Sequence, residues 1–530
     1  MPAGGSPPER WSPRHSPWLI AVVVALAAFM EVLDTSIANV ALPHIAGSLA
    51  ASNDESTWVL TSYLVSNAIV LPLSGWLAGV FGRKRFFLLC ILSFTISSLL
   101  CGAATSLGTL ILFRVMQGAG GGGLQPIAQA ILADTFPPQK RGLAFALYGI
   151  TAVIAPTIGP TLGGWITDNY TWRWIFYINL PIGALTLLLV FRTVEDPPSL
   201  RRTPGDAVRV DYIGIALLSL GIGALQVVLD RGQQDDWFGS QFILTLTIVS
   251  AVSLVALVLW ELFHHDPVID IRLYKNLNFA ASNLMMFMLG VVYFSSLVMM
   301  PQFLQTLLGY TAELAGLVLS ASGIILLLGM PVVGQLTTKV PAKYLIACGW
   351  FLLAASMYYS TQRIDLSISF HVAMWLRVAQ AAGLPFLFVP ITLSSYVGLP
   401  PGKSGDAAGL VNFMRNIGAS VGTSFVTTMV ARRAQFHQTM LSSHTTPYKL
   451  EFQNAVTAIS GQVVLSGTSP ADAQQQAYGI VYREMLAQSQ TLAYIDTFML
   501  LAVGATIMFL LAFLVRRNDP NAEGAEAAVG

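Results

Sequence analysis

Long apolar stretches separated by short polar ones run along the whole chain. The hydrocarbon core of a bilayer is about 30 Å thick and needs about 20 mostly apolar residues per helix. Fourteen stretches of that kind can be placed, at about residues 17–40, 58–80, 86–104, 108–133, 143–166, 173–191, 211–230, 240–262, 279–304, 312–337, 342–360, 370–397, 405–431 and 494–515. Most connections are short, as in antiparallel helical bundles. The pattern predicts an all-α polytopic membrane protein.

The composition narrows the class further. Only 10% of the 530 residues are charged, whereas soluble globular chains carry about 25%. This excludes an ordinary soluble enzyme and a disordered chain. The net charge is only +1, whereas nucleic-acid-binding proteins carry an excess of basic residues. Nucleic-acid binding is therefore not expected. The three cysteines all fall in apolar runs, so the sequence offers no disulfide framework or metal cluster.

The distribution of basic residues sets the expected orientation. Of the 28 Lys and Arg residues, eighteen fall on the side of the N-terminus, seven fall on the other side, and three lie inside spans. Because cytoplasmic loops carry the excess of Lys and Arg, both termini are expected in the cytoplasm. The first span is too long for a cleaved signal peptide and carries two acids, so we expect it to be retained.

An internal repeat organises these spans. Residues 75–85 and 334–343 share a glycine, a leucine two residues later and a final basic residue, at an offset of 259. An Arg-x-x-Gln-x-x-Gly motif occurs at Arg114–Gly120 and again at Arg377–Gly383, at an offset of 263. Two matches at nearly one offset indicate a duplicated six-helix unit with two extra helices between the copies. Parallel halves around a midplane site are a transporter architecture.

The repeat predicts the domain boundaries. They are a cytoplasmic tail (1–16), an N-terminal six-helix bundle (17–191), a linker with two inserted helices (192–278), a C-terminal bundle (279–515) that includes a long outer segment (432–493), and a second tail (516–530).

Several motifs resemble those of one known family, the major facilitator superfamily. They are the first-helix sequence LDTSIANVALP at 33–43, the loop 75–85, the fourth-helix sequence 114–122, the fifth-helix sequence 149–164, and the blocks 168–183 and 229–238. The similarity is greatest to its fourteen-span drug:proton antiporters of the EmrB and QacA type, and to EmrB above all. One residue departs from the family pattern. Gly79 stands where the loop motif usually has an aspartate, which puts gating by that acid in doubt.

The resemblance implies a function. It implies a proton-coupled multidrug exporter that works by alternating access, uses the proton gradient without any cofactor, and carries hydrophobic or amphipathic compounds. It also implies the bacterial inner membrane and, in a tripartite system, a periplasmic adaptor and an outer-membrane channel as partners. The alternative within the same fold is a uniporter or importer of a metabolite.

Ionisable residues inside spans are costly and point to function. Glu31 and Asp34 lie at i and i+3, so they share one face of the first helix. Asp34 matches the family's first-helix acid, and we expect it to be the main proton carrier. Glu31 is expected to sense cationic groups or to share the proton. The family implies that Arg114 faces the first helix and holds a polar network near Asp34. Alternatively, either acid is only a structural partner of Arg114.

Two further groups of candidates follow from residue type and from the resemblance. The candidates for substrate binding are Glu31, Asn39, Gln117, Tyr293, Phe294, Asn412 and Arg415. The candidates for gating are Gly75, Gly82, Arg83, Arg85, Pro156, Gly159, Pro160, Gly163 and Gly164. Glycines allow close helix approach, and prolines disturb the helical hydrogen bonds. We therefore expect a closely packed fifth helix at the interface of the halves.

The outer segment 432–493 is unusually long for a compact membrane protein. Ser469, Pro470 and Asp472 predict a helix start, since they supply an N-cap, a first-turn proline and a first-turn acid. By resemblance, the segment would dock the periplasmic adaptor. The alternative is a helix that lies on the membrane or against its own bundle.

Other function classes fit poorly. A lipid-modifying enzyme would need converging catalytic groups, whereas the seven histidines are scattered. A passive channel leaves the buried acids and the duplication unexplained. Gly118–Gly123 fits a dinucleotide motif but follows no strand, and no phosphate-binding loop for ATP is present.

Overall fold

The computed structural model describes residues 13–197, 210–265, 267–400, 402–443 and 445–513. Within these ranges the chain forms helices and no strands. Eleven of the described helical segments are long and apolar enough to cross a membrane, which confirms the all-α polytopic fold. Of the two predicted tails, only residues 13–16 are among the described residues.

The helices of the N-terminal half match the first six predicted spans. They are α1 (Pro17–Ser48), α2 (Asn53–Ser56), α3 (Trp58–Phe81), α4 (Arg83–Gly102), α5 (Leu107–Gly121), α6 (Leu124–Thr135), α7 (Pro138–Asn169), α8 (Trp174–Tyr177) and α9 (Asn179–Thr193). The predicted span 108–133 is broken into α5 and α6 at Gly122 and Gly123, where a run of glycines weakens the helix.

The inserted pair and the C-terminal half are also built of helices. The inserted helices are α10 (Tyr212–Arg231) and α11 (Gln241–Phe263), and η2 (Trp237–Gly239) and η3 (Ile271–Lys275) flank α11. The C-terminal half contains α12 (Leu277–Leu289), η4 (Gly290–Phe294), α13 (Ser295–Thr306), α14 (Ala312–Leu336), α15 (Ala342–Thr361), α16 (Phe370–Ala382), α17 (Leu384–Ser395), α18 (Ser404–Ser442), α19 (Leu450–Leu465) and α20 (Pro470–Ala512).

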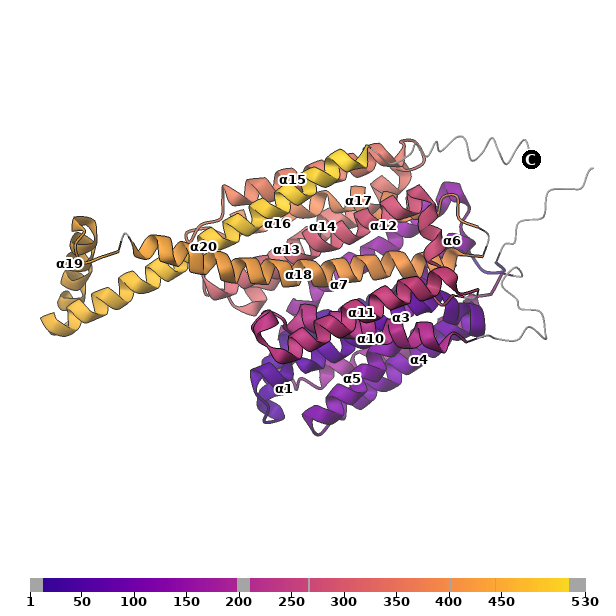
Figure 1. Ribbon diagram of the computed structural model, residues 1–530, viewed down its shortest axis with the longest axis horizontal. Helices are drawn as coiled ribbons and strands as arrows, with labels where there is room; N and C mark the ends of the chain where they lie inside the picture. Colours follow the sequence, from indigo (N-terminus) through magenta and orange to yellow (C-terminus); the bar gives the residue numbers. More distant parts are fainter. Residues whose placement is uncertain (1–12, 198–209, 266, 401, 444, 514–530) are drawn as a thin grey trace, which may run out of the picture.

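The two halves meet mainly along α7 with α14 and α3 with α18, and also along α6 with α18 and α7 with α17. Glycines make these contacts close. A Cβ on Gly142 would lie 2.5 Å from the carbonyl oxygen of Gly334, and one on Gly75 would lie 2.6 Å from the Cα of Asp406. Small residues of this kind let helix backbones approach in a bilayer. Helix α18 begins at the end of the bundle where α20 ends (Figure 1). Asp406 lies in the first turn of α18, so the contact of Gly75 lies at that end.

The inserted helices lie beside the junction of the halves. Thr61 of α3 hydrogen-bonds to Asp230 of α10. On the other side, the Nε2 of Gln226 in α10 donates to the Oγ of Ser420 in α18 at 3.0 Å. The helix α10 therefore contacts both halves, and α11 packs on α10.

The outer segment is a helical projection. Helices α18 and α20 run beyond the bundle, and α19 lies at the tip between them (Figure 1). The last predicted span, 494–515, is only the end of α20, which already begins at Pro470. The helix start is confirmed, since the Oγ of Ser469 accepts a hydrogen bond from the backbone N–H of Asp472. The segment projects away from its own bundle instead of folding back on it.

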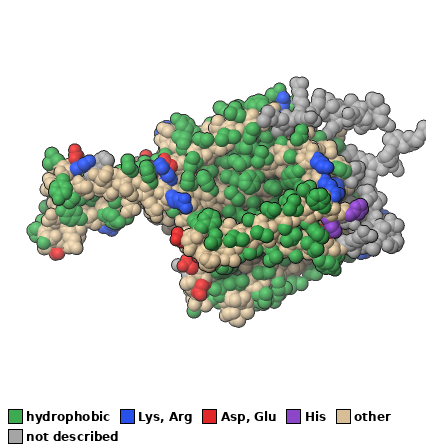
Figure 2. All heavy atoms as spheres, viewed as in Figure 1, with side chains coloured by type: hydrophobic (Ala, Val, Ile, Leu, Met, Phe, Trp, Pro, Cys, Tyr) green, Lys and Arg blue, Asp and Glu red, His purple; other side chains and the backbone are tan. Residues whose placement is uncertain are grey.

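The surface has the distribution expected of a membrane protein. Hydrophobic side chains cover the middle of the visible face, and charged side chains gather toward the two ends of the bundle and on the projection (Figure 2). Exposed large apolar residues are common on α4, α11 and α14. Soluble proteins rarely expose contiguous apolar surface of this extent, whereas membrane proteins expose it to lipid.

Candidate functional site

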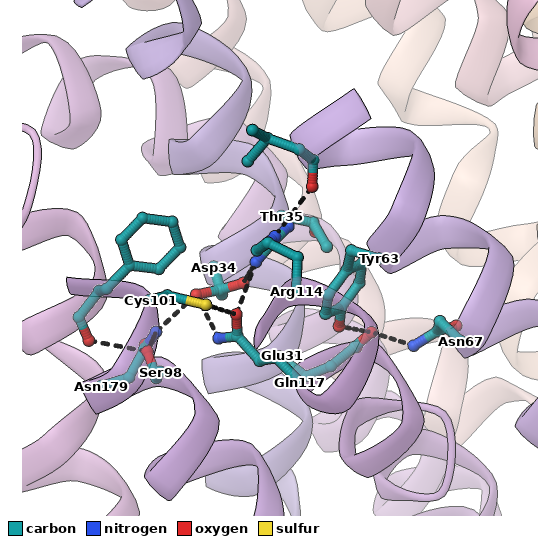
Figure 3. A network of polar contacts seen from close by, with 12 residues as sticks. Glu31, Asp34, Thr35, Tyr63, Asn67, Ser98, Cys101, Arg114, Gln117 and Asn179 are labelled. Atoms are coloured by element: carbon teal, nitrogen blue, oxygen red, sulfur yellow. Dashed lines mark hydrogen bonds and ion pairs between the residues drawn. The ribbon is translucent and has the colours of Figure 1, made fainter. Parts of the chain in front are cut away.

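Asp34 lies at the centre of a buried polar network inside the N-terminal half. Its side chain is on α1 and the residue is 2% exposed. Its Oδ2 accepts a hydrogen bond from the Nη1 of Arg114 at 2.6 Å. Its Oδ1 accepts from the Nε2 of Gln117 at 2.9 Å and from the Nδ2 of Asn179 at 2.6 Å. Helices α1, α5 and α9 thus meet at one carboxylate (Figure 3).

The guanidinium of Arg114 is fully buried and has several partners. Its Nη1 also donates to the Oε1 of Gln117 at 2.8 Å, and its Nε donates to the carbonyl of Val59 at 3.1 Å. It stacks on the ring of Tyr63, with 4.2 Å between the guanidinium carbon and the ring centroid. Further hydrogen bonds offset the cost of burying an ion pair, and of this guanidinium only the Nη2 lacks one among the described residues. Arg114 thus lies beside Asp34, as expected, and other groups support its guanidinium.

Glu31 lies one turn earlier on α1 and points to different partners. Its Oε1 accepts from the hydroxyl of Tyr63 at 3.0 Å and from the Nδ2 of Asn67 at 3.2 Å. Its Oε2 accepts from the Nε2 of Gln125. In the described part of the chain no cation pairs directly with Glu31. Tyr63 connects the two acids, because its ring contacts Arg114 and its hydroxyl contacts Glu31 (Figure 3).

The run of glycines between α5 and α6 makes this arrangement sterically possible. A Cβ on Gly121 would lie 2.6 Å from the hydroxyl oxygen of Tyr63. A Cβ on Gly122 would lie 2.8 Å from the carbonyl oxygen of Asn67. Only glycine allows α3 to come so close, so the motif that resembled a dinucleotide site is a helix-packing surface.

Two of the predicted substrate residues lie at the contact between the halves. Arg415 of α18 donates from its Nη2 to the Oε1 of Gln125. Asn412, one turn earlier, donates from its Nδ2 to the Oε1 of Gln129 at 2.9 Å. Both contacts cross from α6 in the N-terminal half to α18 in the C-terminal half.

The other predicted substrate residues lie apart from this network. Tyr293 is buried in the π-helical segment η4 of the C-terminal half, and Phe294 contacts its ring edge-on at 5.6 Å. Asn39 is exposed on α1 and makes none of the network's hydrogen bonds. Among the predicted substrate residues, Glu31 and Gln117 belong to the buried network, and Arg415 joins it through Gln125.

The C-terminal half contains a copy of the network without the acid. The Nη1 of Arg377 donates to the Oε1 of Gln380 at 3.0 Å and to the Oγ of Ser296 at 3.1 Å. The guanidinium lies over the ring of Tyr293 at 4.8 Å. Ser296 corresponds to Asp34 at an offset of 262 residues. Among the described residues, Arg377 has no carboxylate partner.

The predicted gating residues of the loop meet the opposite half. Arg83 is buried, pairs with Asp134 of α6, and donates from its Nη2 to the Oγ of Ser404 in α18 at 3.1 Å. Gly82 has a φ of +83°, which favours glycine and lets the chain turn into α4. Arg85 is exposed. Asp134 therefore contacts the loop where Gly79 replaces the family's usual acid.

The fifth-helix residues pack mainly within their own half. A Cβ on Gly159 would lie 2.5 Å from the Cβ of Ser36, and one on Gly163 would lie 3.1 Å from Ile37, so both glycines face α1. A Cβ on Gly164 would meet nothing within 4 Å. Helix α7 continues through Pro156 and Pro160. The expected contact of α7 with the other half exists, but it is made by other residues, among them Gly142 and Thr157.

The close contact of Gly75 with α18 gives a direct test of the gate. Gly75→Leu is expected to prevent the halves from closing at this end, because the new side chain would overlap the backbone of Asp406. Gly79→Leu is the matched control on the same helix, since nothing lies within 4 Å of a Cβ there. Drug resistance of an efflux-deficient host, corrected for protein abundance, should be lost only in Gly75→Leu. Equal resistance of the two variants would show that this contact does not form in the working cycle.

Comparison with known proteins agrees with the fold. Residues 24–423 match the model of the Major Facilitator Superfamily. The multidrug export protein EmrB of Escherichia coli K12 is 39% identical over 470 residues, which cover 89% of this chain and 90% of that protein. EmrB of Haemophilus influenzae is 41% identical, covering 81% and 84%. The solved proton:xylose symporter XylE superimposes with a TM-score of 0.61 at 14% identity, covering 95% and 97%, and shows the fold alone.

The fold and the duplicated polar networks are those of a transporter with two related halves. The chain belongs to the EmrB-type drug:proton antiporter family of the major facilitator superfamily. It is a multi-pass membrane protein and a multidrug efflux transporter, not an enzyme.

Sequence reasoning missed several members of the site. They are Tyr63, Asn67, Ser98, Gln125, Asn179 and Asn416. A signal was available, because each is a polar residue within an apolar stretch, where polar groups need partners. Their partners come from other helices, so the sequence alone did not pair them.

Proposed function

We propose that this transporter couples drug export to proton entry and that Asp34 carries the proton. This proposal is supported by the ion pair of Asp34 and Arg114, whose Oδ2 and Nη1 atoms lie 2.6 Å apart and are buried inside the N-terminal half. A proton on Asp34 removes the negative charge that balances the guanidinium. The ionised and protonated forms therefore favour different arrangements of α1, α5 and α9, and a ligand or proton that prefers one arrangement shifts the population toward it.

The proposed orientation follows from the charges and the contacts together. We place the end with Gly75, Arg83 and Asp406 in the cytoplasm, because that side carries the excess of basic residues. The protein would then lie in the bacterial inner membrane with both termini inside. In this arrangement α3 and α6 close against α18 at the cytoplasmic end, which corresponds to access from the outside.

A transport assay tests the proposed function. Everted membrane vesicles would be given a preset proton gradient, which is followed with a pH-sensitive dye. Addition of an amphipathic drug should dissipate the gradient in vesicles with this protein and not in vesicles without it. Drug uptake that is indifferent to the gradient would refute proton coupling. Movement of a metabolite down its gradient, with no response to drugs, would favour the uniporter alternative.

We further propose that the projection formed by α18, α19 and α20 binds a periplasmic adaptor that leads to an outer-membrane channel. Its support is the extension of the two spanning helices beyond the bundle (Figure 1) and the similarity to EmrB over 89% of the chain. The projection contains exposed apolar residues, among them Leu450 and Tyr478.

Removing the tip of the projection separates its role from transport itself. Replacement of 445–469 by a short flexible linker is expected to leave drug-driven proton release in everted vesicles at the wild-type rate. Drug resistance of whole cells should fall to the level of cells without the protein, because the exported drug would remain in the periplasm. Full resistance of cells with the shortened protein would contradict adaptor binding at the tip.

A further inference from the structure

Glu31 is connected to the C-terminal half through two side-chain amides. Asn67 donates from its Nδ2 to the Oε1 of Glu31, and its own Oδ1 accepts from the Nδ2 of Asn416 at 3.3 Å. Gln125 donates from its Nε2 to the Oε2 of Glu31, and its own Oε1 accepts from the Nη2 of Arg415. Each carboxylate oxygen therefore reaches one of two adjacent residues of α18 through one amide.

The chemistry of the end groups fixes the orientation of the Gln125 amide. An ionised carboxylate can only accept hydrogen bonds, and a guanidinium can only donate them. An amide between them must turn its NH₂ toward Glu31 and its carbonyl toward Arg415. The hydroxyl of Tyr148 donates to the same carbonyl oxygen at 3.2 Å, which reinforces this orientation.

A proton on Glu31 changes this arrangement. Protonated Glu31 carries an O–H donor, which needs an acceptor in this buried place. Gln125 supplies an acceptor to Glu31 only if its amide turns over, and its NH₂ then faces the guanidinium of Arg415, which can only donate. Two donors facing each other cannot bond, and a buried donor without an acceptor is costly. The contact of α6 with α18 is therefore weakened when Glu31 binds a proton on Oε2, the oxygen that faces Gln125.

We propose that Gln125 is a positioning residue that transmits the protonation of Glu31 to Arg415 and so releases α18 from the N-terminal half. The proposal rests on the proposed proton coupling and adds a second proton-sensitive step to it. Asp34 titrates inside the N-terminal half, whereas Glu31 controls the contact between the halves. The other charged or titratable groups around Glu31 are Asp34 on α1, Tyr63 on α3, Arg114 on α5, Tyr148 on α7 and Arg415 on α18.

The neighbouring glutamine provides a matched control. Gln129 lies one turn further along α6, is buried, and also bonds across the interface, to Asn412. It makes no hydrogen bond to Glu31. Gln125→Met and Gln129→Met each remove one amide contact between α6 and α18 with little change in shape, but only the first removes the connection to Glu31.

Distances between the halves can be followed over a pH series. Nitroxide labels on cysteines placed at Phe81 and Tyr344 report the separation at the end with Gly75, since both positions are exposed and lie on opposite halves. Cys348 is exposed and would be replaced by serine, whereas Cys90 and Cys101 are buried. The protein would be reconstituted in lipid nanodiscs and measured by electron–electron double resonance.

The expected results differ for each variant. The wild type and Gln129→Met should open at this end as the pH falls, with the same midpoint. Gln125→Met should lose the pH dependence. Gln125→Glu should open only at a lower pH than the wild type, because a carboxylate at this position accepts from Arg415 even when Glu31 carries a proton. A wild-type response in Gln125→Met, or no response in the wild type, would overturn the proposal.

The vesicle assay separates this proposal from the proposed function. If drug-driven proton release is present and Gln125→Met keeps the pH response of Gln129→Met, only the role of Gln125 is wrong. If the wild type shows no drug-driven proton release, the proposed coupling itself fails. Size-exclusion chromatography checks that each variant is folded. If Gln125→Met does not fold, Gln125→Glu still tests the proposal.

Discussion

Asp34→Asn is expected to reduce drug-driven proton release in everted vesicles to the level of vesicles without the protein. Asparagine has nearly the shape of aspartate, and its carbonyl oxygen can still accept a hydrogen bond from Arg114. Its NH₂ then faces the amide donors of Gln117 and Asn179, so only that side of the network must rearrange. Asparagine cannot bind and release a proton in the accessible range, however. Fluorescence of the pH-sensitive dye after drug addition measures the effect.

The duplicated half offers the control for Asp34→Asn. Ser296 takes the place of Asp34 beside Arg377, and its Oγ accepts from the Nη1 of that arginine at 3.1 Å. Ser296→Ala removes an equivalent buried contact without removing a group that could carry the proton, so proton release should remain. Wild-type release in Asp34→Asn would show that another group carries the proton, and Glu31→Gln would then be the variant to measure.

Arg114→Met is expected to lower the free energy of unfolding by about 3–5 kcal/mol, whereas Arg377→Met should change it by no more than about 1 kcal/mol. The first variant leaves the buried carboxylate of Asp34 without its cation. The second removes a buried cation that has no carboxylate partner in the described structure. Ser296 keeps a partner in Arg377→Met, because its hydroxyl also donates to the carbonyl of Tyr293 at 2.7 Å.

Thermal unfolding of the purified variants in the same detergent measures this difference. The two arginines lie at corresponding places of the two halves and are both fully buried, so the comparison cancels the loss of packing. Equal losses of stability would mean that the ion pair with Asp34 is not what makes Arg114 important. The free energy would then come from the contacts with Tyr63 and Val59.

The candidate site was predictable only in part. The family resemblance implied that Arg114 lies near Asp34, which agrees with the need of buried ionisable groups for a partner. Glu31 was recognised by its charge, but its partners were not. Asn67 and Gln125 carry no charge and come from different helices, so nothing in the sequence marks them as the neighbours of Glu31.

Two expectations about helices were incomplete for the same physical reason. The fifth-helix glycines Gly159 and Gly163 were expected to pack at the interface of the halves, but they face α1. Glycine spacing shows that something packs closely and does not show what. The start at Pro470 was expected, yet the continuity of this helix with the last span was not, because a polar stretch ends the apolar pattern without ending the helix.

The sequence by itself determined the class of structure. Lipid excludes unpaired backbone groups and charged surface, so apolar stretches, flanking basic residues and the repeat were enough to predict an all-α membrane protein with two related halves. Only the tertiary structure decided which side chains meet. The contacts of Glu31 with Gln125 and of Gln125 with Arg415 join three helices that are far apart in the chain, and hydrogen bonds of a few ångströms depend on how those helices pack.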